Sequence, residues 1–111
     1  MAWPALCAIK RAGGSASNAE VEEAVAAELK LTDEQRALPR TRRGTRTLLD
    51  YRLAWARTFL KNMGAIAYDA PRQWSITEIG RDTTPEDIEE FKKKMLDKLA
   101  EYNQVRERRT R

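Results

Sequence analysis

The sequence predicts a mainly α-helical protein with a small β-hairpin, arranged as a winged helix-turn-helix with an amphipathic helix after it. Apolar residues recur at helical spacing in three segments before residue 64. Apolar and polar residues then alternate on either side of a turn over residues 65–76. Three helices followed by a hairpin is the element order of a winged helix-turn-helix. A further helical stripe follows residue 84.

The ends of the first helices are marked by local signals. A first helix is predicted from Trp3 to Ala12, with a proline near its start and two glycines directly after it that end the helix. Ser17-Asn18-Ala19-Glu20 is a capping box that predicts a helix running to about Lys30. Thr32 to Gln35 repeats the capping pattern and predicts a short helical turn that ends before Pro39.

The longest helix before the hairpin is predicted from about Arg46 to Met63. Its apolar stripe follows steps of four and three and consists of Leu49, Leu53, Ala56, Leu60 and Met63. Gly64 stands where a helix commonly ends in a left-handed glycine. Trp55 widens the stripe, and we expect both Trp55 and Trp74 to lie in the core.

The hairpin and the tail follow. Residues 65–68 and 73–76 are expected to pair around a turn at Asp69-Ala70-Pro71-Arg72. Thr84-Pro85 then marks the start of the last helix. Its apolar stripe consists of Ile88, Phe91, Met95, Leu99 and Tyr102. We expect this stripe to pack on the domain's own core, on a second copy of the chain, or on a partner domain.

The composition argues against an enzyme. The chain has no histidine and one cysteine, Cys7, so neither a Ser-His-Asp triad nor a structural zinc site is available. The carboxylates are expected on exposed helix faces beside lysines rather than paired in a pocket. We therefore expect no catalytic residue, no metal and no cofactor. A lone cysteine is typical of the reducing cytoplasm, and no apolar run is long enough to span a bilayer, so we expect no membrane partner.

Charge is distributed unevenly along the chain. Residues 15–35 hold six carboxylates and one lysine, a net charge of −5. Residues 36–61 hold eight bases and one aspartate, a net charge of +7. Such a segment makes a local positive field that attracts a polyanion, although a solvated basic surface without a partner is the alternative. In a winged helix-turn-helix the third helix enters the major groove and the hairpin reaches along the backbone. The expected DNA-binding residues are Arg40, Arg42, Arg43, Arg46, Thr47, Asp50, Tyr51 and Arg72.

The arginines are expected mainly on phosphates. Arg42 and Arg43 lie in the loop before the long helix, where the free N–H groups of the helix end also favour phosphate. Arg46 is expected on a phosphate or on a guanine edge. Arg72, in the hairpin turn, is expected on the backbone or in the minor groove. For Arg57 a packing or ion-pair role and a DNA role are both open.

Three other residues are candidates for base contact. Thr47, Asp50 and Tyr51 fall on the exposed face of the first half of the long helix, where base edges would lie. Asp50 has two interpretations: it accepts a hydrogen bond from a cytosine amine, or it orients Arg46 or Arg43.

The stretch Thr45 to Gly80 resembles the N-terminal winged-helix domain of Mrr-type restriction proteins. The matching residues are Trp55-Ala56-Arg57, Leu60-Lys61, Gly64, Trp74-Ser75-Ile76-Thr77 and Gly80. With the acidic second helix, the resemblance covers about residues 3–82. It implies a bacterial restriction system in which this domain binds DNA, by analogy DNA with methylated cytosine, and a separate nuclease domain cuts it. The Asp…Glu-x-Lys pattern of that nuclease does not follow here.

We accordingly expect a winged-helix DNA-binding domain over residues 1–82 and a linker, dimerisation or packing helix over residues 83–111. The expected partners are double-stranded DNA and, through residues 84–105, a second copy or a nuclease domain. Two alternatives stay open: a small dimeric transcriptional regulator and a winged helix that docks on other proteins. The salt dependence of the binding affinity distinguishes DNA binding from apolar docking, because only phosphate contacts weaken steeply as the salt concentration rises.

Overall fold

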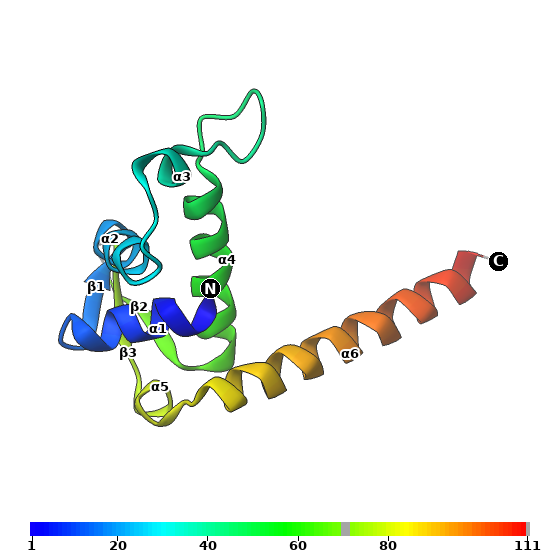
Figure 1. Cartoon of the computed structure of the whole chain (residues 1–111). Helices are drawn as coiled ribbons and strands as arrows, with labels where there is room; N and C mark the ends of the chain where they lie inside the picture. The colour runs from blue at the N-terminus through cyan, green and yellow to red at the C-terminus, as the bar shows by residue number, and fades with distance from the viewer. Residues whose placement is uncertain (70–71, 111) are drawn as a thin grey trace.

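The computed structural model describes residues 1–69 and 72–110, the last six of these as backbone only. Its body has a winged-helix-like arrangement in which helices pack on a small antiparallel sheet, and one long helix projects from it (Figure 1). The fold class predicted from the sequence is therefore confirmed. In chain order the elements are α1 (Ala2–Arg11), β1 (Ser15–Ser17), α2 (Asn18–Glu28), α3 (Asp33–Ala37), α4 (Leu48–Met63), β2 (Ile66–Asp69), β3 (Gln73–Ile76), α5 (Glu78–Asp82) and α6 (Pro85–Thr110).

The predicted caps set the helix boundaries. The Ser17 hydroxyl accepts from the Glu20 amide at 3.2 Å, and the Glu20 carboxylate accepts from the Ser17 amide at 3.2 Å, so both arms of the capping box at α2 are present. The box at α3 is also complete. Helix α4 begins two residues later than predicted because Thr47 is its N-cap, its hydroxyl accepting from the Asp50 amide at 3.1 Å. Gly64, with φ +85°, ends it.

The sheet contains a strand that the sequence analysis did not predict. Strand β1 pairs antiparallel with β3, Ala16 opposite Trp74, and β3 therefore lies between β1 and β2. Gly13 and Gly14, with φ of +90° and +101°, turn the chain into β1, and the Ile76 amide donates to the Gly14 carbonyl at 2.7 Å. Three residues are too few to show a recognisable alternation, so a period-two pattern could not reveal this strand.

The core lies between α1, α2, α4 and the sheet. Its fully buried large side chains are Leu6, Ile9, Val21, Val25, Leu53 and Leu60. Trp74 packs against this core, half-buried, with its indole N–H donating to the Asn18 side chain at 2.6 Å. The prediction for Trp55 was wrong, because its exposed fraction is 58%. At 3.6 residues per turn Trp55 lies about 200° around the helix from Leu53, so it points away from the core.

Helix α6 is attached to the body only near its start. Ile88 is buried, and the Phe91 ring meets the Phe59 ring of α4 edge to face, with centroids 5.2 Å apart. Beyond these residues α6 leaves the body (Figure 1). Within the described part of the chain, neither α6 nor another helix is both long and apolar enough to cross a membrane.

Candidate nucleic-acid interface

The segment 39–47, here called the basic loop, stands out from the body between α3 and α4 (Figure 1). Backbone hydrogen bonds close its base: the Arg40 amide donates to the Arg46 carbonyl at 3.0 Å, and the Leu48 amide to the Leu38 carbonyl at 2.8 Å. Pro39 and Thr47 form an isolated antiparallel bridge between the same two segments. The basic loop is therefore fixed at its base, directly before the first turn of α4.

Arg40 is held against the first half of α4 by an aromatic ring. Its guanidinium lies 3.8 Å from the centroid of the Tyr51 ring, which is cation–π geometry. The Arg46 guanidinium lies 5.9 Å from the same ring. The Tyr51 side chain thus gathers two positive charges at the point where the basic loop joins the helix.

Arg46 also forms an ion pair on α4. Its Nε donates to Asp50 Oδ2 at 2.5 Å, four residues along the chain. Of the two interpretations of Asp50, orienting Arg46 is the one that this geometry matches, whereas contact with a cytosine stays a prediction. Both side chains are partly exposed, and such pairs contribute only about 0.3–0.5 kcal/mol. A phosphate could therefore replace the aspartate as the partner of Arg46.

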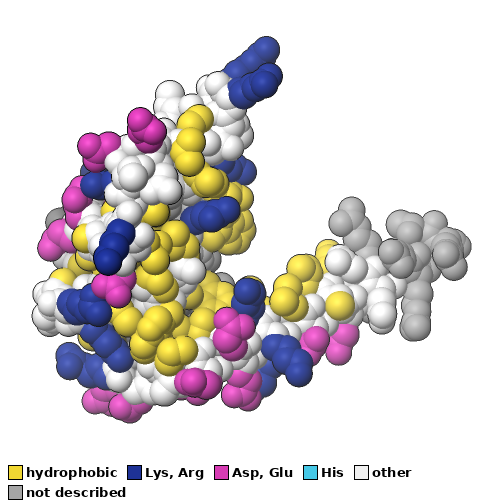
Figure 2. All heavy atoms as spheres, viewed as in Figure 1, with side chains coloured by type: hydrophobic (Ala, Val, Ile, Leu, Met, Phe, Trp, Pro, Cys, Tyr) yellow, Lys and Arg dark blue, Asp and Glu magenta, His cyan; other side chains and the backbone are white. Residues whose placement is uncertain are grey.

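Arg42 and Arg43 are the exposed charges of the basic loop. In the part of the chain that the structure describes, no carboxylate lies within 4.0 Å of either guanidinium. Figure 2 shows Lys and Arg side chains at the end of the molecule where the basic loop stands in Figure 1. These two charges are thus available to an anionic partner.

The N-terminus of α4 has fewer free amide groups than the sequence suggested. The Leu48 amide donates to Leu38, and the Asp50 amide donates to the Thr47 hydroxyl. Two of the four amides that a helix start leaves unpaired are therefore already satisfied. Thr47 is occupied as a cap, and its expected base contact stays a prediction. Anion binding at this end consequently depends on the arginine side chains.

Arg57, whose role the sequence left open, is buried. Only 5% of its surface is exposed, and burial lowers the pKa of its guanidinium, with the attraction of Asp50 opposing that shift. Among the described residues no carboxylate is within 4.0 Å of it. The structure thus favours the packing role over a DNA contact.

Arg72 lies at the hairpin turn between β2 and β3, as expected. It is exposed, its φ is +57°, and its backbone amide donates to the Tyr68 hydroxyl at 3.1 Å. Residues 70 and 71 of the same turn fall outside the described residues. Arg72 belongs to a different element from the other seven predicted residues, which gather at the basic loop and the start of α4.

The sequence did not reveal that part of the basic charge is neutralised by α2. Arg36, counted in the basic segment, pairs with Glu23 at 2.5 Å. Its hydrogen bond, and then its charge, lower the pKa of the Glu23 carboxyl. The two residues are thirteen apart and meet only when α3 packs near α2, so no local spacing could have indicated the pair. Among the described residues, no three metal-ligating side chains meet.

The comparisons with known proteins give one match. The sequence model of the Mrr N-terminal domain family matches residues 1–86, which comprise the winged-helix-like body and the first residues of α6. No curated protein and no solved structure matches the chain.

Proposed function

Because the chain belongs to the Mrr N-terminal domain family, we propose that it is the DNA-recognition module of a restriction system and binds double-stranded DNA through the basic loop and α4. The observation that carries the proposal is the position of Arg42 and Arg43. They are exposed, with no carboxylate within 4.0 Å among the described residues, on a loop fixed next to the first turn of the helix that would enter the major groove.

The residues of this surface would have different roles in DNA binding. Arg42 and Arg43 hold phosphates, which give affinity and register without reading sequence. Arg40 is already placed by the Tyr51 ring, so less side-chain entropy is lost when a phosphate binds it. Arg46 would exchange Asp50 for a phosphate or a guanine edge. Thr47, Asp50 and Tyr51 face base edges, and Arg72 meets the backbone or the minor groove.

The proposed role is binding alone. We assign no catalytic residue to this chain, and cleavage would belong to a nuclease domain that acts with it. Restriction systems work on DNA in the cytoplasm, which is where we place the protein.

The test is fluorescence anisotropy with a labelled duplex of random sequence, comparing two double variants. Arg42→Ala/Arg43→Ala removes two phosphate contacts and should lower the salt slope of log K by about 1.8, at about 0.9 per contact. Arg81→Ala/Lys93→Ala removes the same charge at exposed positions outside the basic loop and α4, and should leave most of the slope intact. Equal losses in the two variants would show that only net charge matters, and unchanged binding by the first would place the DNA surface elsewhere.

Base reading is tested separately. Unlabelled competitor duplexes of one sequence, with and without methylated cytosines, are titrated against the same complex. If the domain reads the modification, the methylated competitor displaces the label at a lower concentration. Equal displacement by both would leave phosphate binding in place and remove the assignment to modified DNA.

A further inference from the structure

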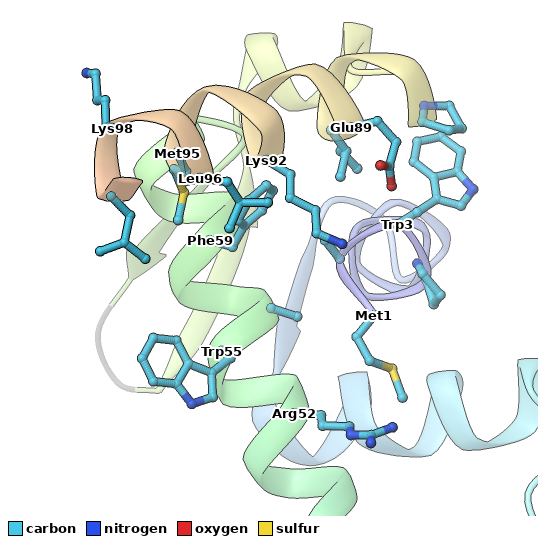
Figure 3. A pocket seen from close by; sticks show the side chains of 16 residues that line it. Met1, Trp3, Arg52, Trp55, Phe59, Glu89, Lys92, Met95, Leu96 and Lys98 are labelled. Carbon is cyan, nitrogen blue, oxygen red and sulfur yellow. The ribbon is translucent and has the colours of Figure 1, made fainter. Parts of the chain in front are cut away.

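An apolar groove of about 890 Å³ lies where α6 leaves the body. Its walls come from the start of the chain, from α4 and from α6 (Figure 3). The apolar residues that shape it include Met1, Trp3, Trp55, Phe59, Met95 and Leu99. The exposed Trp55 side chain therefore borders a groove along this face of α4, which the described part of the chain leaves open.

The apolar stripe of α6 runs along the groove and continues past it to Tyr102. Met95, Leu96, Leu99 and Tyr102 have exposed fractions of 43%, 57%, 56% and 64%. A lone helix in water is marginal, and helices in proteins are stabilised mostly by packing an amphipathic face. Figure 2 shows apolar side chains on the projecting helix and on the body across the hollow. Exposed apolar surface of this kind marks an interaction site.

The charges of α6 indicate what covers this surface. In the sequence of this helix, residues 85–92 hold four carboxylates against one lysine, and residues 93–110 hold six bases against three carboxylates. Two such helices placed side by side in parallel would bring like charges together. Placed antiparallel, each acidic start would face the basic end of the other copy. The helix is therefore complementary to a second copy of itself in one orientation.

We propose that the groove and the projecting part of α6 form the interface of an antiparallel homodimer, in which the α6 of each copy covers the groove of the other. An interface with two-fold symmetry needs a ridge and a matching hollow on the same chain. Here the ridge is the stripe from Met95 to Tyr102, and the hollow has Trp3 and Trp55 in its walls.

The dimer does not depend on DNA binding. If both hold, one dimer carries two basic loops and suits a DNA site with two-fold sequence symmetry. The test below measures mass in the absence of DNA, so its result is independent of the anisotropy experiments.

The experiment is sedimentation equilibrium of the full chain from low to high micromolar concentration. We expect the mass to rise from 12.8 kDa towards twice that value. Leu99→Glu alters the ridge and Trp55→Glu alters the hollow, at positions that are more than half exposed in one chain. Each should weaken association by about 100-fold or more, because every substitution occurs twice and a buried hot-spot side chain contributes at least about tenfold.

Ile79→Glu is the matched control, because Ile79 is 60% exposed on α5 and does not line the groove. It should leave association unchanged. Circular dichroism of the three variants at low concentration checks that the monomer fold is kept. Added salt should weaken the dimer, since the end-to-end charge pairs are screened. A monomeric mass throughout, or a dimer that tolerates either Leu99→Glu or Trp55→Glu, would overturn the proposal. Association strengthened by salt would overturn the antiparallel orientation.

Discussion

Gly80 is the position where the fold should tolerate an added methyl group least. A Cβ built there would lie 2.0 Å from the Ala65 carbonyl oxygen and 2.8 Å from the Ile76 side chain. Ordinary contact begins at 3.4 Å, so α5 would have to retreat by roughly 1.4 Å. The same carbonyl accepts the Thr77 amide at 3.1 Å, and the Thr77 hydroxyl donates to the Gly64 carbonyl. The retreat would strain or break both hydrogen bonds.

The expected loss follows from these two effects. Overpacking costs about 1–3 kcal/mol, and each weakened hydrogen bond adds up to about 1 kcal/mol. We therefore expect Gly80→Ala to lower the free energy of unfolding by about 3 kcal/mol. For a domain of this size that corresponds to a fall in Tm on the order of 10 °C. Urea and thermal denaturation followed by circular dichroism measure both quantities.

Gly13→Ala is the control for this prediction. Gly13 has φ +90°, but no atom of the other described residues lies within 4 Å of an added Cβ. Only backbone strain then applies, about 1 kcal/mol. If Gly80→Ala loses no more stability than Gly13→Ala, the close contact between α5 and the Ala65 carbonyl does not limit the residue at position 80, and the reasoning is refuted.

Two further predictions concern local interactions. Thr47→Ala should destabilise the protein by about 1 kcal/mol in a urea titration, because α4 loses its cap. The control Thr58→Ala, at an exposed position within α4, should be neutral or slightly stabilising. Equal effects of the two substitutions would contradict the capping role. The Glu23 carboxyl should titrate below its ordinary pKa in an NMR titration, and Arg36→Ala should return that pKa to the ordinary value. Because the pKa of Glu23 is lower in the folded state, the Arg36–Glu23 pair stabilises the protein at pH values above the unfolded-state pKa. This stabilisation is lost as the pH falls through the folded-state pKa. A Glu23 pKa unaffected by Arg36→Ala would show that the ion pair does not persist in solution.

The sequence was most informative where a signal is local. The capping box at Ser17 and the glycine at the end of α4 each depend on residues a few positions apart, and both are present in the structure. Strand β1 was missed because its pairing with β3 joins residues almost sixty positions apart. Trp55 was misplaced because α4 is apolar on more than one side, and periodicity cannot tell a side that faces the core from one that faces the groove.

The candidate site divides in the same way. The ion pair of Arg46 with Asp50 follows from their spacing of four residues on one helix and was among the expected roles. The stacking of Arg40 on Tyr51 was not foreseen, because it depends on how the basic loop closes on itself. The apolar stripe of α6 was predicted, but its exposure and the groove beside it depend on the three-dimensional arrangement.

The central claim is that the chain binds DNA through arginine contacts to phosphate. The measurement that tests it most directly is the affinity of the unaltered protein for a random duplex as a function of salt concentration. With about three phosphate contacts, log K should fall with log[salt] at a slope near −2.7, so that a fourfold rise in salt weakens binding by about 40-fold. No binding at low salt, or binding that does not change with salt, would contradict the claim.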